Sequence, residues 1–455
     1  MGRGPAEQLG LSLLECAAHV EAGPMEKATR CLARATSLAA VAGDGPQKRL
    51  AVTMVDCLAW GLLRPVPAIT DALIDPPCYL DRRSVRAARR GFFELSPFPK
   101  VAFVVSNRAI LEAVENESCV HVVGTSGPAT QPCQWIQLLH ELRRRPEGPP
   151  RVVWLTVVHD DGELLTKMAE LLHDEAEELD MEFQFHGVVG QLEELDFSNL
   201  HIVFEIKSGE ALAVSCTLQL HRLLATDDAT YSFRAAHLNQ MASIAQLQHM
   251  AAASSCPPSS DGAPDAAALS SFLSAVRALS PKIVVVEEQD ADHNGISFRK
   301  RFCEALHHYA AVFDSLDAAA ATSGASHLWP PDERAQVECV VVGEEIKGVL
   351  LREGAHQRER HERLWHWAAR MEMAGFAGVP LSYDAIRQGN DMVRRCGLRR
   401  CESKECSGCL LLCWSSRPLY SISAWRPAAS RGSGSCSERS EYMSVPSQMI
   451  DESGT

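Results

Sequence analysis

The stretch CVHVVGTSGP, residues 119–128, decides the fold of this chain. Its first half is rich in β-branched residues, which favour a strand that is covered on both faces. The residues that form this strand are Val120, His121, Val122 and Val123. The glycine-bearing turn that begins at Gly124 ends the strand, and from Gln134 and Trp135 onward apolar residues recur at helical spacing. Strand, turn and helix in this order open a βαβ unit, so we predict an α/β fold.

Apolar runs of similar character recur further along the chain. Additional buried strands are predicted at 152–158, 183–185 and 282–286. The run 210–216 leads into another helix. The segment 408–425 alternates apolar and polar residues in two pieces, which predicts an antiparallel hairpin that closes the sheet.

Regions of different composition divide the chain. After a short extension of residues 1–6, apolar stripes at helical spacing over 7–116 predict a mainly helical cap, and 117–426 is predicted to form the α/β core. Ala, Ser and Pro dominate around 226–271 and predict a disordered insertion, and the Ser-rich residues 427–455 predict a disordered tail. The expected fold is therefore a Rossmann-like, methyltransferase-like core sheet with an N-terminal helical cap.

The overall composition excludes several classes of protein. With 455 residues, 46% hydrophobic and 22% charged, the chain has the composition of a globular protein. No uninterrupted apolar run is long enough for a transmembrane helix, and no secretory signal is visible. Sixteen scattered cysteines favour a reducing cytosolic or nuclear compartment. A net charge of −14 weighs against broad contact with a nucleic-acid backbone.

Several short segments occur in an order that is typical of one family. After a leucine-rich helical part they are Val120-His121-Val122-Val123, Gln134-Trp135, a second leucine-rich helix, Ser280-Pro281-Lys282, Arg358-Glu359-Arg360-His361-Glu362 and Ser423-Ala424-Trp425. In this order they resemble the leucine-rich, VHIID, PFYRE and SAW segments of plant GRAS-domain regulators. The resemblance covers residues 7–426, and the run Gly343–Lys347 is similar to that of the scarecrow-like protein 3 subgroup.

The resemblance implies a non-enzymatic regulator of transcription in the nucleus. Its expected partners are DNA-binding transcription factors of the zinc-finger type and other GRAS proteins such as DELLA-type repressors, in gibberellin-linked growth and development. A homodimer or heterodimer is compatible with this role, whereas direct sequence-specific DNA binding and membrane association are not expected. The residues marked as motif or protein-binding positions are Val120, His121, Val122, Val123, Gln134, Trp135, Leu220, Leu223, Leu224, Arg358, Glu359, Arg360, Glu362, Trp414, Ser423, Ala424 and Trp425.

Gly124 and Gly127 after the first strand raise the alternative of a cofactor-binding turn. A third glycine is missing, Pro128 lacks an N–H donor, and the acids Asp160 and Asp161 come too late to hold a ribose. We therefore predict no cofactor. An S-adenosylmethionine-dependent or other small-molecule methyltransferase on the same scaffold is the alternative function. Gly124 also stands where the VHIID segment ends in Asp, so a family role for that carboxylate is in doubt here.

Two other clusters contain metal-ligand types. The first combines Glu287, Glu288, Asp290, Asp292 and His293 just past a strand, and a polar turn would satisfy the same residues. The second consists of Cys396, Cys401, Cys406, Cys409 and Cys413, and these fit ordinary strand cysteines as well as zinc ligands. We predict no metal site. No Ser/His/Asp constellation can be recognised, so no catalytic residue is predicted.

Two motifs leave structural and binding interpretations open. Leu220, Leu223 and Leu224 match LxxLL, whose leucines either dock in a coregulator groove or pack into the core. The Arg358–Glu362 run is predicted to lie on an exposed, charged helix over 343–373, with i,i+3 and i,i+4 pairs of about 0.2–0.5 kcal/mol each. In the closing hairpin, at least one of the tryptophans Trp414 and Trp425 is predicted to be buried.

Overall fold

The protein is divided into two compact units, each built from several segments of the chain. The computed structural model describes residues 5–41, 45–63, 81–224, 267–295, 297–322, 330–351 and 359–429. The first, which we call the helical unit, comprises Met1–Ser96, Leu220–Phe272 and Ala291–His361. The second, the sheet unit, comprises Pro97–Gln219, Leu273–Asp290 and Glu362–Thr455.

The sheet unit is organised by nine strands in the order β3-β2-β1-β4-β5-β9-β8-β7, with β6 paired to β9. The strands are β1 (Cys119–Thr125), β2 (Val152–His159), β3 (Phe183–Val189), β4 (Ala211–Thr217), β5 (Ile283–Gln289), β6 (Phe376–Val379), β7 (Cys401–Cys406), β8 (Cys409–Trp414) and β9 (Arg417–Pro427). Strands β1 to β5 run parallel to one another, and β9 runs antiparallel to β5. The strand order reverses between β1 and β4, which is where doubly wound sheets hold their ligands.

The sequence predicted most of this sheet. The strands expected at 120–123, 152–158, 183–185 and 282–286 are confirmed as β1, β2, β3 and β5, and the closing hairpin is confirmed as β8 and β9. Strand β4 was missed. All seven of its residues are buried between β1 and β5, but its sequence, ALAVSCT, contains few β-branched residues.

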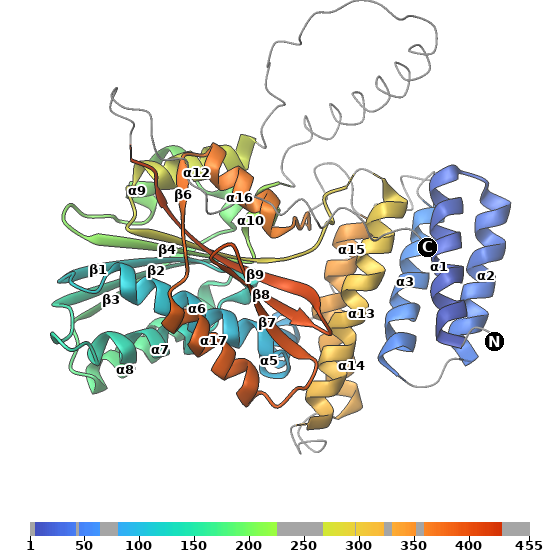
Figure 1. Ribbon diagram of the computed structural model, residues 1–455, viewed down its shortest axis with the longest axis horizontal. Helices are drawn as coiled ribbons and strands as arrows, with labels where there is room; N and C mark the ends of the chain where they lie inside the picture. Colours follow the sequence, from blue (N-terminus) through green and yellow to red (C-terminus); the bar gives the residue numbers. More distant parts are fainter. Residues whose placement is uncertain are drawn as a thin grey trace, which may run out of the picture. The chain divides into compact units, whose positions relative to one another are not determined.

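Helices cover both faces of this sheet. They are α6 (Pro97–Ala113), α7 (Pro132–Arg143), α8 (Gly162–Glu178), α9 (Leu200–Val203), α16 (Leu364–Met373) and α17 (Tyr383–Arg395). Figure 1 shows α6, α7, α8 and α17 on one face and α9 and α16 on the other. Helix α6 is buried along most of its length and packs on β5 and β9, as its almost wholly apolar sequence requires. It belongs to the sheet unit although it precedes residue 117.

The helical unit contains elements from both ends of the chain. They are α1 (Pro5–Ala22), α2 (Met25–Val41), α3 (Pro46–Leu63), α5 (Arg82–Leu95), α10 (Leu220–Leu223), α13 (Phe298–Thr322), α14 (Pro331–Val337) and α15 (Glu344–Leu350). Helices α1, α2 and α3 pack on one another, and α13 packs against α1 and α3 (Figure 1). Arg49 of α3 ties this packing together, because its guanidinium donates to Glu338 at 2.7 Å and to Asp317 at 2.9 Å.

The helix predicted over 343–373 is wrong in its middle. A π-helical turn (Glu338–Gly343) continues into α15, which ends at Leu350, and helix α16 begins only at Leu364. Residues 359–363 between them are not helical. Arg360 and Glu362 are each only 4% exposed, so tertiary contacts have overridden the helical propensity of this charged run. Arg358 lies outside the described residues.

Two predictions of disorder fall largely on residues that the structure does not describe. Residues 225–266 and 430–455 lie outside it, so disorder there remains a prediction. The last five residues of the expected insertion, 267–271, are helical because α12 (Ala267–Ala278) begins there. Similarly, β9 extends to Pro427, where the tail was predicted to begin.

Candidate functional site

The carboxyl end of β1 is the first place to examine for a ligand site in this fold. A Cβ atom added to Gly124 would lie 2.6 Å from Cζ2 of Trp135, a contact that real Cβ atoms essentially never make. Trp135 comes from α7 and is only 1% exposed. The indole therefore occupies the space into which a side chain at position 124 would project. A side chain at position 124, where the resemblance placed a carboxylate, would require this indole to move.

The turn after β1 is closed by a second side chain. Gly127 begins a short 3-10 turn with φ of +42°, and a Cβ there would lie 2.7 Å from the side-chain amide of Gln219. Gln219 is buried and its Nε2 donates to the Leu218 carbonyl at 2.8 Å. A cofactor phosphate needs close approach to free backbone N–H groups at this turn. Instead, Gln219 covers the glycine that would permit such an approach.

His121, in the middle of β1, is held by hydrogen bonds at both ring nitrogens. Nδ1 lies 2.8 Å from a Glu210 carboxylate oxygen, and Nε2 lies 2.9 Å from the Thr156 hydroxyl. Burial lowers the pKa of His121, against the opposing effect of Glu210. With 1% exposure and both nitrogens engaged, this imidazole ties β1 to its neighbours and is not presented to a substrate.

A buried polar network links α6, α7 and β5. The Ser106 hydroxyl donates to the Glu287 carboxylate, and the Asn107 side chain donates to the Gln134 carbonyl at 2.8 Å. Burial raises the pKa of Glu287 to about 7, although the hydrogen bond from Ser106 acts in the opposite direction. Sequence reasoning missed Ser106 and Asn107. The feature of the sequence that could have revealed them is an adjacent polar pair within a mainly apolar helix.

Glu287 has the shifted pKa of an acid–base catalyst but not the accessibility of one. It is 2% exposed, and both Ser106 and the adjacent acid Glu288 are buried with it. Successive residues of a strand project to opposite faces, so Glu287 and Glu288 cannot bind one ion together. Asp290 is also engaged, because it accepts from the Leu364 N–H at 2.7 Å and from Arg363 at 3.2 Å. Glu287 and Asp290 thus bond to other segments of the fold, Glu287 to Ser106 and Asp290 to Arg363 and Leu364.

In the helical unit, a second buried network contains part of the predicted Arg358–Glu362 run. The Glu359 carboxylate lies 2.8 Å from Nε2 of His221 and 3.4 Å from the Arg222 guanidinium. Burial alone would raise the pKa of Glu359, but Arg222 and His221 lower it well below its ordinary value. His361 lies with its Nδ1 2.9 Å from Nδ1 of His293, and burial holds its pKa well below its usual range.

Three further described residues of that run, Arg360, His361 and Glu362, are buried as well. In the sheet unit, Glu362 accepts from Nε of Arg370 at 2.6 Å and from its Nη2 at 2.9 Å. This pair joins residues eight apart in the sequence. The prediction of exposed i,i+3 and i,i+4 pairs over Arg358–Glu362 is therefore wrong for Glu359 and Glu362, which pair with residues outside the run.

Other marked residues also lie in the core. Leu220 and Leu223 are 0% exposed and Leu224 is 3% exposed, so this LxxLL face is covered within the protein. Trp414 and Trp425 are 2% and 0% exposed, in agreement with the expected burial of a hairpin tryptophan. Trp425 pairs with Val284 across β9 and β5, and its Nε1 donates to the Ser423 hydroxyl at 2.9 Å. Ala424, between them, pairs with Val285.

Three metal-ligand side chains come within 4.8 Å of one another in two places among the described residues. One group is His221, Glu359 and His361, and the other is Glu15, His19 and Cys31. Neither contains the acids after β5 or any of the cysteines between positions 396 and 413. Of the latter, Cys409 and Cys413 are buried in strand β8. Sequence reasoning did not mark the second group.

Comparison with known proteins identifies close relatives of this chain. A sequence model of the GRAS domain family matches residues 9–426. Scarecrow-like protein 3 of Arabidopsis thaliana is 40% identical over 91% of this chain and 88% of its own length. DELLA protein GAI1 of Vitis vinifera is 30% identical over 92% of this chain and 61% of its own length. The crystal structure of SCL7 from Oryza sativa matches with a TM-score of 0.70 at 27% identity, over 93% of this chain and all of that one.

No helix within the described residues combines the length and the apolar character that a bilayer crossing needs.

Proposed function

This chain belongs to the GRAS domain family, and we propose that it is a non-enzymatic regulator of transcription in the nucleus. It acts through contacts with zinc-finger DNA-binding factors and with other GRAS proteins, including DELLA-type repressors. Scarecrow-like and DELLA members of the family are plant regulators in gibberellin signalling and development. The 40% identity to one of them supports the same field of action for this chain.

The observation that carries the non-enzymatic role is the filled end of β1. Trp135 lies where a side chain of residue 124 would project, and Gln219 covers Gly127. In a doubly wound fold this is the crevice in which a dinucleotide or S-adenosylmethionine would bind. These two contacts support a turn without the open, glycine-rich approach that such a cofactor needs. A regulator that works through its outer surface is consistent with this arrangement.

Recruitment to DNA by a partner follows from charge. The net charge of −14 would repel the phosphate backbone, which supplies most non-specific binding energy in DNA-binding proteins. We expect the purified chain alone to give no footprint on a promoter at physiological salt. Together with a zinc-finger factor that binds the same promoter, it should produce a slower-migrating ternary complex. A footprint produced by the chain alone would overturn this part of the proposal.

The partners are tested by affinity capture from plant nuclear extract with mass-spectrometric identification. The proposal expects DNA-binding factors and GRAS proteins to be enriched over a matched Trp425→Ala bait, whose sheet should be disrupted. Direct binding is then checked with purified partners. Enrichment of small-molecule enzymes without any transcription factor would contradict the proposed role.

The alternative function, a methyltransferase, makes a separate demand. It requires S-adenosylmethionine to bind at the end of β1, and no described feature of that turn favours it. Isothermal titration with S-adenosylmethionine distinguishes the two functions, because the regulator is expected to release no binding heat.

A further inference from the structure

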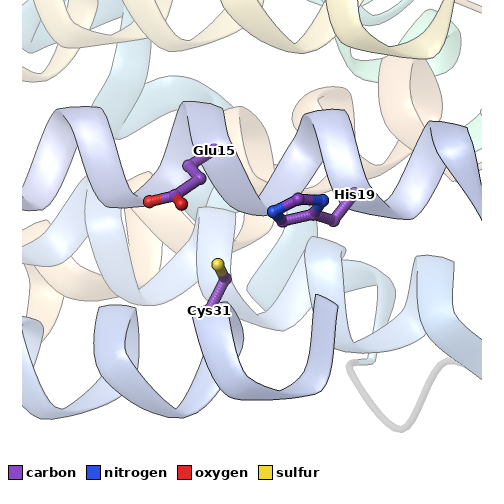
Figure 2. Close-up of side chains that lie close together, drawn as sticks. All are labelled: Glu15, His19 and Cys31. Carbon is purple, nitrogen blue, oxygen red and sulfur yellow. The ribbon is translucent and has the colours of Figure 1, made fainter. Parts of the chain in front are cut away.

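The pair of N-terminal helices α1 and α2 carries three side chains that converge outside both networks described above. Glu15 and His19 lie four residues apart on α1, so they share one face of that helix. Cys31 projects toward them from α2, as Figure 2 shows. A carboxylate oxygen, an imidazole nitrogen and the thiol sulfur all lie within 4.8 Å of one another.

These three donors are the types that zinc prefers. Thiolate and imidazole favour Zn²⁺ over Mg²⁺ or Ca²⁺, which take oxygen ligands. Zinc sits about 2.3 Å from sulfur and about 2.0–2.2 Å from nitrogen or carboxylate oxygen, so tetrahedral ligands are roughly 3–4 Å apart. The donor atoms lie within 4.8 Å of one another, so the side chains would rotate to close on an ion. We propose that Glu15, His19 and Cys31 form a zinc-binding site with its fourth position open to water.

The electrostatics of the group favour a cation. The Glu15 carboxylate brings one negative charge to the group, and a zinc-bound Cys31 thiolate would bring another. A divalent ion between them would compensate both negative charges, so zinc binding would release the thiol proton. Arg34 is the competing cation, with Nη1 4.0 Å from a Glu15 oxygen. Its side chain is 64% exposed and can turn into solvent when zinc enters.

Cys16, the neighbouring cysteine of α1, is not a ligand. It is 0% exposed and its thiol donates to the Ala28 carbonyl at 3.6 Å. The proposed site therefore uses Cys31, which is only partly buried and faces the two ligands of α1.

The other close group of metal-ligand side chains is less suited to binding zinc. In His221, Glu359 and His361 the carboxylate is already compensated by the Arg222 guanidinium at 3.4 Å. That arginine is only 19% exposed, which leaves it little freedom to withdraw. Zinc would have to displace a buried ion pair there, whereas at Glu15 it displaces an exposed one.

The test is Co²⁺ and Zn²⁺ binding to the purified full chain, because Co²⁺ reports thiolate coordination through a charge-transfer band. The wild-type chain should bind one equivalent with this band, and Zn²⁺ should displace Co²⁺. Cys31→Ser should abolish the band and weaken binding at least about tenfold. His19→Gln should also weaken it by about tenfold or more. Cys31→His, which keeps a ligand, should retain the ion without the band.

A matched control is available on α13. The Cys303 sulfur lies 3.7 Å from Nδ1 of His307, also four residues apart, but outside both close groups of three. Cys303→Ser should leave the band and the affinity unchanged. The proposal is overturned if the wild-type chain gives no band, if Cys31→Ser retains it, or if Cys303→Ser removes it. Circular dichroism of each variant verifies that helix content is unchanged, so that loss of the ion reports loss of a ligand.

Discussion

Two buried glutamates have opposite ionisation behaviour in this protein. Glu287, in the sheet unit, is hydrogen-bonded by the Ser106 hydroxyl, and burial raises its pKa to about 7. Glu359, in the helical unit, lies beside Arg222 and His221, which lower its pKa despite burial. The difference is the cation: the hydroxyl donors Ser106 and Thr217 do not offset desolvation of the Glu287 carboxylate, whereas a guanidinium and an imidazole together do so at Glu359.

This comparison separates a perturbed pKa from a catalytic role. Groups with shifted pKa values often mark active sites, but structural networks shift pKa values too. Here each carboxylate joins segments that are distant in the sequence, Ser106 to Glu287 in one unit and Arg222 to Glu359 in the other. Both shifts are explained by what holds the fold together.

The largest expected effect comes from truncating Trp425, on the strand that pairs with the Glu287 strand β5. Trp425→Ala should destabilise the sheet unit by about 3–5 kcal/mol, because it truncates a fully buried tryptophan. Trp425 lies on β9, which pairs with β5 through Val284↔Trp425 and Glu287↔Ile422. Thermal and urea melts measure the loss, and partner capture should fall with it.

A deletion provides the control for that variant. Strand β9 ends at Pro427, so removal of residues 430–455 should leave the melting temperature nearly unchanged. If instead Trp425→Ala melts like the wild type and still loses partner binding, the closing strand is a docking element and its structural role is refuted.

A smaller loss of stability is expected when the cation beside Glu359 is removed. Arg222→Ala should destabilise the chain by about 2–4 kcal/mol at pH 7, somewhat below a fully buried pair because the arginine is 19% exposed. Adding Glu359→Gln should recover part of the loss, since no buried charge is then left uncompensated. A double-mutant cycle from urea melts measures this coupling. Additive effects of the two substitutions would show that Arg222 does not set the charge of Glu359.

The smallest expected effect is a dependence of stability on pH. Because folding raises the pKa of Glu287 from 4.5 to about 7, the folded state retains a proton that the unfolded state has lost. This proton contributes roughly 1–3 kcal/mol to the free energy of unfolding. The contribution is fully present below about pH 4.5, decreases as pH rises, and is lost above about pH 7. Glu287→Gln should flatten this decline in urea melts at pH 5 and 7.5. An unchanged decline would assign the proton to another group.

The order of the strands and helices was easier to predict from the sequence than the contacts of the site residues. Valine-rich runs marked β1, β2 and β5 because β-branched residues are diagnostic for buried parallel strands, whereas the Ala-rich β4 carried no such mark. The charged run ending at Glu362 has the composition of an exposed helix. Its actual partners, such as Arg370 for Glu362, are set by tertiary structure and cannot be seen in the sequence. Gly124 was noticed as an exception, but only the structure shows Trp135 beside it.

Isothermal titration of the purified chain with S-adenosylmethionine and with NAD is the decisive measurement. Trp135 and Gln219 lie against Gly124 and Gly127 at the carboxyl end of β1, and we propose that the chain works without a cofactor. No binding heat is expected for either compound. Saturable binding with a dissociation constant below about 100 μM, roughly −5.5 kcal/mol, would contradict it.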